Sequence, residues 1–234
     1  MTARGVVLLH GTPLSPEVWD GVRAELSVPS SAPDLNGLID QAGQGCLQTE
    51  VAAQVLDGLP DGEMVVVGHS FGGQIAIELA LLAPHRLAHL VVVCSRHTPF
   101  PAFARGAQTV RAGRPPDIDA GLHRWFTASE LAADGTAVKY ARRQLHTAAL
   151  GPWAAALDAI ATYDRADAVS GIEVPSLLLA GGIDEVASPA VMARLAADLP
   201  HGRLEVVAAW AHMSPFAEPG AFAARLRTAL RFPT

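Results

Sequence analysis

The sequence has few cysteines, no long apolar run and a deficit of positive charge. Its two cysteines, Cys46 and Cys94, are too few for a disulfide framework and have no spacing typical of a metal site. No stretch approaches the ~18 apolar residues of a membrane-spanning helix. The formal net charge of −6 at pH 7 argues against a general nucleic-acid-binding protein. We therefore expect a soluble, cytoplasmic protein with no membrane or nucleic-acid partner.

What is present is a large apolar fraction arranged in short runs. Half of the 234 residues are hydrophobic, which suffices for a sizeable core in one α/β domain or a domain with an inserted subdomain. Short apolar runs, typical of strands buried on both faces, alternate with helical patterns on either side of the middle of the chain. This alternation predicts an α/β fold with a doubly wound, mostly parallel sheet.

Residues 64–73 contain the pattern that is most informative about function. Three valines favour a buried strand, and the residues from Gln74 onward favour a helix that packs on it. Between them, the sequence G-H-S-F-G at residues 68–72 matches G-x-S-x-G, the nucleophile elbow. This turn pushes a serine hydroxyl clear of the sheet, and its glycines leave room for neighbouring backbone. Ser70 is therefore the candidate nucleophile.

A serine nucleophile needs a histidine base, and the histidine needs a carboxylate that fixes its tautomer. Asp184 follows an apolar strand predicted over residues 174–180, and His212 follows the last predicted strand, residues 204–207. The chain order Ser70, Asp184, His212 is the Ser-Asp-His order of α/β-hydrolases. Glu185 is the rival acid, and Asp184 is preferred because it comes first after the strand.

A second expected part of the site is the loop after the first strand, where the sequence reads L-H-G-T-P at residues 9–13. A loop in this position supplies an oxyanion donor in α/β-hydrolases. Pro13 has no N–H group, so Thr12 is the candidate donor. His10 is expected to be structural.

Residues 96–165 interrupt the alternation of strands and helices. They contain helical patterns around 129–148 and 152–163 and no strand pattern, which predicts a helical cap inserted into a core made by residues 1–95 and 166–234. Residues 96–150 carry seven Arg and one Lys against four acidic residues, a net charge of +4 in a chain that is otherwise −10. The charge indicates either an anion-attracting surface or a merely solvated face.

Taken together, these motifs resemble the α/β-hydrolase superfamily from end to end, through residues 9–13, the elbow, G-G-I-D at 181–184 and A-H at 211–212. The resemblance implies an acyl-enzyme on Ser70 and hydrolysis by water that His212 activates. It also implies an oxyanion hole made by the backbone N–H groups of Thr12 and Phe71, and no metal or organic cofactor.

The cap is similar to that of the 3-oxoadipate enol-lactonases and small carboxylesterases, through H-R-W-F-T at 123–127 and the segment 148–164. Two features depart from the family pattern. Members usually begin with a strand hairpin, whereas this chain starts at the strand before His10, so about six strands are expected. The glycine-rich loop that helps to shape the pocket is replaced by L-I-D-Q-A-G at 38–43.

The resulting prediction is a serine hydrolase that cleaves a small carboxylic ester or lactone, acting as a monomer or small homo-oligomer. Arg124, beside Trp125, is the first candidate for binding an anionic substrate, and Arg96 is the second because it follows a strand end. Three other activities use the same triad and stay open: carbon–carbon bond hydrolysis, thioester hydrolysis and perhydrolysis. A non-catalytic receptor with the same fold is a further alternative.

Overall fold

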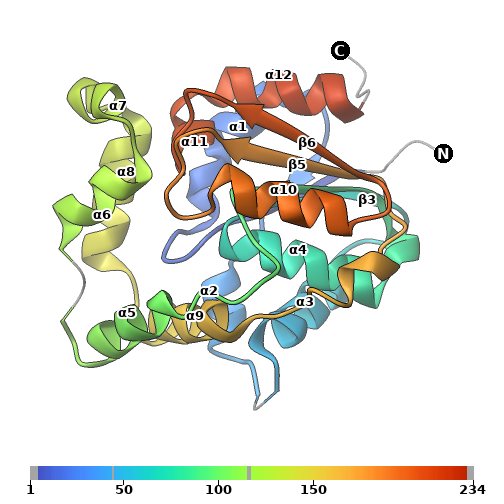
Figure 1. The fold of residues 1–234 in the computed structure, drawn as a ribbon, viewed down its shortest axis with the longest axis horizontal. Helices are drawn as coiled ribbons and strands as arrows, with labels where there is room; N and C mark the ends of the chain where they lie inside the picture. The colour runs from blue at the N-terminus through green and yellow to red at the C-terminus, as the bar shows by residue number, and fades with distance from the viewer. Residues whose placement is uncertain (1–4, 44, 115–116, 231–234) are drawn as a thin grey trace.

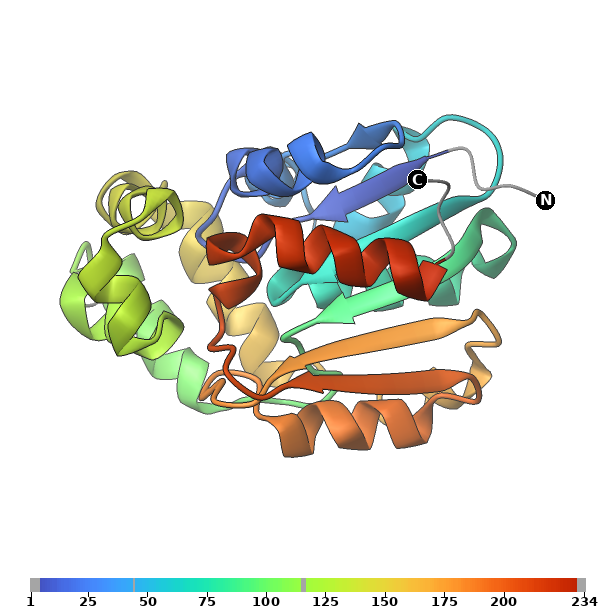
Figure 2. The same cartoon turned by 90° about the horizontal axis from the view of Figure 1, so that it is seen from above.

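The structure is a computed structural model that describes residues 5–43, 45–114 and 117–230. A parallel sheet runs through the molecule with helices on both of its faces (Figures 1 and 2). Within the described residues the sheet has six strands, and every neighbouring pair is parallel. Their spatial order is β2 (Ser30–Ser31), β1 (Val6–Leu9), β3 (Met64–His69), β4 (Leu87–Val93), β5 (Ser176–Gly181) and β6 (Gly202–Val207). This confirms the expected α/β-hydrolase type of sheet.

The burial of each strand follows from its sequence. β1, β3 and β5 are buried along their whole length, as their uninterrupted apolar residues predict for strands covered on both faces. β6 forms one edge and has only half-buried and exposed residues. Successive side chains of a strand point to opposite faces of the sheet, and they pack into two separate hydrophobic cores, one on each face.

Helices divide between the two faces. One face packs against η1 (Pro16–Trp19), α1 (Asp20–Glu25) and α12 (Pro219–Leu230) through Trp19, Val22 and Phe222. The other face carries the following helices: α2 (Leu35–Ile39), α3 (Leu47–Asp57), α4 (Phe71–Leu82) and α10 (Pro189–Asp198). Among the described residues, no helix is long and apolar enough to cross a membrane.

Between β4 and β5 the described chain forms helices only. They are α5 (Ala102–Arg111), α6 (Ile118–Trp125), α7 (Ala128–Ala133), α8 (Thr136–Thr147), α9 (Leu150–Thr162) and the short 3₁₀ helix η3 (Val169–Gly171). Figure 1 shows α6, α7 and α8 beyond the arrowheads of β5 and β6, whereas α9 lies beside α2. In a parallel sheet the carboxyl ends of the strands share one edge, so these helices stand over the edge where ligands of such sheets bind.

The sequence does not predict α5, α6 or α2. Proline-rich flanks and the interior glycines of α5 and α6 weaken the helical pattern there, and the two helices form because they pack on α9 and α8. Residues 35–39 form α2, and Asp34 caps this helix by accepting a hydrogen bond from the Asn36 N–H.

Candidate active site

Ser70 lies at the turn between β3 and α4 with φ 53° and ψ −119°, a conformation that non-glycine residues rarely adopt. Its N–H donates to the Val93 carbonyl at 3.0 Å, and its carbonyl accepts from the Gly73 N–H at 2.9 Å and the Ser95 hydroxyl at 2.6 Å. A Cβ on Gly68 would collide with the backbone of Gly72. The surrounding structure therefore holds Ser70 in the strained geometry of a nucleophile elbow.

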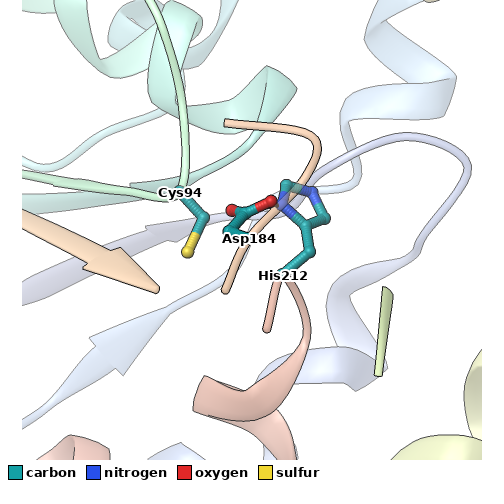
Figure 3. A group of neighbouring side chains, drawn as sticks. All are labelled: Cys94, Asp184 and His212. Atoms are coloured by element: carbon teal, nitrogen blue, oxygen red, sulfur yellow. Dashed lines mark hydrogen bonds and ion pairs between the residues drawn. The ribbon is translucent and has the colours of Figure 1, made fainter. Parts of the chain in front are cut away.

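The carboxylate of Asp184 and the ring of His212 form a buried hydrogen-bonded pair, with Oδ2 and Nδ1 2.9 Å apart. Figure 3 shows the carboxylate directed at the ring. Oδ1 of Asp184 accepts from the N–H groups of Val186 at 2.7 Å and Ala187 at 3.0 Å. Burial alone would raise the pKa of Asp184, but the charge and hydrogen bond of His212, together with these two N–H groups, lower it.

This geometry fixes the tautomer of His212. An ionised carboxylate only accepts hydrogen bonds, so Nδ1 of the ring carries the proton and Nε2 of the neutral ring is left as an acceptor. The loop around His212 is held on both sides, because the Ala211 N–H donates to the Ser214 hydroxyl and the Met213 N–H donates to the Trp125 carbonyl. Glu185, the rival acid, is exposed rather than buried.

A cavity of about 110 Å³ brings Thr12, Ser70 and His212 together on one wall. Most of its remaining lining is apolar and comes from the helices between β4 and β5. This lining includes Phe103, Gly106, Gly121, Leu145, Trp153 and Leu157, and the exposed carboxylate of Asp117 also lies along the cavity. A pocket with apolar walls and a few polar groups at one end is the usual form of a small-molecule site.

Two hydrogen-bond donors lie near Ser70, one in the next residue of the chain and one in the cavity lining. Phe71 is the first residue of α4, so its backbone N–H has no acceptor within the helix. The Thr12 side chain lines the cavity, and its hydroxyl is buried without a hydrogen-bond partner among the described residues. An unsatisfied buried polar group costs free energy unless a ligand pairs with it.

The two arginines expected to bind substrate have different surroundings. Arg124, at the end of α6, is exposed and lines the cavity together with Trp125. Arg96 is half-buried, donates from Nη2 to the Val186 carbonyl at 3.0 Å, and lies 3.9 Å from the centre of the Phe100 ring. Burial lowers the pKa of Arg96 although the charge of Asp184 opposes this. The guanidinium of Arg96 is therefore used within the protein.

His69, the residue before the serine, contacts His212 in a way that the sequence analysis missed. It is fully buried, its Nε2 lies 3.0 Å from the His212 carbonyl oxygen, and the two rings are 4.8 Å apart. Burial and the nearby His212 lower the pKa of His69 to about 3, so it stays neutral and its Nε2–H donates to that carbonyl. The position of His69 directly before Ser70 in the elbow motif was the sequence signal that could have predicted this contact.

Cys94, predicted to be a buried thiol, lies directly after β4 with φ 48° and is fully buried. Its Sγ and the ligand atoms of Asp184 and His212 all lie within 4.8 Å of one another (Figure 3). These donor types can bind zinc. The hydrogen bond between the other two residues occupies two of the three atoms, and burial raises the pKa of the thiol. The group thus fits an acid–base pair with a protonated thiol beside it.

Two other buried histidines, His10 and His97, have structural roles and do not line the cavity with Ser70. His10 donates from Nδ1 to the Gly11 carbonyl and accepts the Leu35 N–H at Nε2, as expected for a structural residue. His97 is buried and its Nε2 lies 2.8 Å from Asp198, away from the cavity wall formed by Ser70. Of these three histidines, only His212 lines the cavity with Ser70.

Comparison with known proteins identifies the family of the chain and several relatives. Residues 6–225 match the sequence model of the alpha/beta hydrolase family. A pimeloyl-(acyl-carrier protein) methyl ester esterase of Citrobacter koseri is 32% identical over 238 residues, covering 93% of this chain and 90% of that protein. A relative of the same name from Salmonella typhimurium is 29% identical and covers 95% and 92%.

Two solved structures are similar over almost the whole chain. A thermophilic esterase from Thermogutta terrifontis has a TM-score of 0.84 and 27% identity, covering 98% of this chain and 90% of that one. The enol-lactonase from Burkholderia xenovorans LB400 has a TM-score of 0.85 at 22% identity, covering 99% and 93%. The second likeness shows a shared fold only.

Proposed function

The chain belongs to the alpha/beta hydrolase family, and on that premise we propose that it hydrolyses a small carboxylic ester through an acyl-enzyme on Ser70. The observation that supports this most directly is that Ser70 and His212 line the same cavity, with Asp184 hydrogen-bonded to the histidine at 2.9 Å. A nucleophile, a base and an orienting acid are the minimum set for this chemistry.

In the proposed first step, Nε2 of His212 removes the proton from the Ser70 hydroxyl as its oxygen attacks the ester carbonyl. The developing oxyanion is stabilised by the backbone N–H groups of Thr12 and Phe71. His212 then passes the proton to the departing alcohol, which leaves an acyl group on Ser70. A water molecule, deprotonated by His212, attacks this acyl group and restores the serine.

Asp184 serves this cycle without gaining a proton. The groups around it keep its pKa low, so the carboxylate stays charged and compensates for the charge that His212 acquires. The elbow hydrogen bonds keep Ser70 in place while its hydroxyl reacts, because rigid positioning of the reacting groups contributes much of the rate enhancement.

Residues 96–165 act as a cap in this proposal, over a core made by residues 1–95 and 166–234. The cap supplies the apolar walls of the cavity and two exposed charged residues, the cation Arg124 and the anion Asp117. We assign the binding of a substrate carboxylate to Arg124 rather than to Arg96, whose guanidinium already pairs with Val186 and Phe100.

The relatives favour an ester over a lactone, a thioester or a carbon–carbon bond. The curated relative at 32% identity is named a methyl ester esterase of a carrier-bound dicarboxylic acyl group. A methyl ester at the end of a longer acyl chain is therefore the second candidate substrate, and the enol-lactone is the third, since it rests on a likeness of fold.

A panel of small esters, lactones and thioesters tests the proposal, with the Ser70→Ala protein as the blank. Turnover of short p-nitrophenyl esters that the blank lacks would support it. Turnover of a lactone or thioester in preference to every ester would identify another member of the same reaction class. If none of the panel is turned over, the receptor alternative becomes the better interpretation.

A further inference from the structure

Two glycines stand in the interior of short helices that wall the cavity. Gly106 is the fifth residue of α5, and Gly121 is the fourth residue of α6. Glycine inside a helix destabilises it by about 0.5–1 kcal/mol relative to alanine. Both residues line the cavity that contains Ser70. When a residue at a functional site destabilises its own helix, the absence of a side chain there is expected to serve the function.

Close packing between helices does not explain either glycine. A Cβ at Gly106 would lie 3.6 Å from Cδ1 of Leu157, which is ordinary van der Waals contact. A Cβ at Gly121 would lie 3.3 Å from Cδ1 of Leu145, the flexible end of a side chain. At Gly68, by contrast, the collision is with backbone. Alanine therefore fits at Gly106 in ordinary contact, and at Gly121 after the end of the Leu145 side chain shifts by a few tenths of an ångström. What it would take away at both positions is cavity space.

The cavity is small enough for one methyl group to matter. A protein cavity of about 150 Å³ binds benzene, which has six carbons, so the 110 Å³ here accommodates about four. The neighbours of the two glycines, Leu157 and Leu145, line the same cavity, so each new Cβ would lie against its wall. In an enclosed apolar pocket, one methylene changes kcat/KM by about 10- to 200-fold.

We propose that the apolar cavity beside Ser70 is the acyl-chain site, and that Gly106 and Gly121 set its capacity at about four carbons. The inference rests on the proposed ester hydrolysis. The alcohol must leave before water can attack, whereas the acyl group stays on Ser70 through both steps. The largely apolar space next to the serine therefore suits the acyl chain.

The test compares p-nitrophenyl esters from acetate to decanoate in the wild-type protein, Gly106→Ala and Gly121→Ala. Wild type should have its highest kcat/KM near butanoate and fall off steeply beyond hexanoate. Each variant should lower the ratio of kcat/KM for butanoate to that for acetate by about 10-fold or more. Gly151→Ala is the matched control, since it lies in the first turn of α9 and its Cβ would meet nothing within 4 Å.

Thermal melting separates specificity from damage. The variants should melt at or above the wild-type temperature, because alanine favours the helix. An unchanged butanoate-to-acetate ratio in active variants would overturn the inference. So would loss of all activity in a variant that melts normally, because the space would then serve the reacting carbonyl. If wild type hydrolyses none of these esters, it is the proposed function that fails.

Discussion

The side chain of His69 holds the backbone of His212: Nε2 of the first lies 3.0 Å from the carbonyl oxygen of the second, and both residues are buried. The same His69 ring lies edge-on to Phe216 at 4.9 Å. Because His69 directly precedes Ser70, this hydrogen bond connects the elbow to the loop of the proposed base. The two loops are thus fixed relative to each other by one buried interaction.

Replacing His69 by leucine should therefore lower kcat. We expect a loss of about 10- to 100-fold with little change in KM, because a displacement of ~1 Å in the base costs that much in rate. His69→Gln, whose amide can still donate to the His212 carbonyl, should retain most of the activity. The measurement is steady-state kinetics on one ester, and full kcat in His69→Leu would contradict the positioning role.

The same histidine predicts a dependence of stability on pH. An unfolded histidine takes up a proton below its ordinary pKa of 6.5, whereas folded His69 does so only near its pKa of about 3. The unfolded state thus binds more protons in this window, so His69 makes the protein less stable as pH falls from about 6.5 toward 3.

Denaturant unfolding of wild type and His69→Gln from pH 7.5 to 4.5 measures this effect. The difference in unfolding free energy should shift in favour of the variant by about 1.4 kcal/mol per pH unit below 6.5. His123→Gln, on the exposed side of α6, is the control. Curves that stay parallel at every pH would show that His69 titrates normally.

The Thr12 hydroxyl gives a third prediction. It lines the cavity and is buried without a partner among the described residues, so we expect it to donate to bound substrate. Thr12→Ala should lower kcat/KM about 10-fold, the worth of one hydrogen bond, and Thr12→Ser should restore it. A fall beyond ~100-fold, typical of a lost oxyanion donor, would show that the backbone had moved.

Arg124 gives a fourth prediction. A matched pair of esters, one ending in a carboxylate and the other in its neutral methyl ester, measures charge preference. Wild type should have the higher kcat/KM for the acid, and Arg124→Ala should lose that preference, since it removes the exposed cation at the cavity. Arg96→Ala should keep it. Equal wild-type rates for the two esters would make the basic cap a solvated surface.

Much of the fold was predictable because its signals are local. Apolar runs identify β1, β3 and β5 as buried strands, and the sheet is parallel with six strands among the described residues, as expected. α5 and α6 were not predictable, because glycine interrupts their helical pattern and their stability comes from packing on α9 and α8.

The part of the site that depends on chain order and on the geometry of a parallel sheet was predictable from the sequence. Ser70, Asp184 and His212 each follow a strand, and parallel strands bring such loops to one edge. The contacts of His69 and the place of Cys94 beside Asp184 depend on how separate loops meet in space. No local sequence pattern predicts these contacts between loops. The catalytic roles themselves remain predictions.

Covalent labelling shows whether Ser70 is the nucleophile. A phosphonate that reacts with activated serines, followed by peptide mass spectrometry, should modify Ser70 in wild type and leave Ser70→Ala unmodified. His212→Ala should be folded and label far more slowly, because the base is gone. Labelling of another serine with activity lost, or ester hydrolysis by Ser70→Ala at the wild-type rate, would contradict the account.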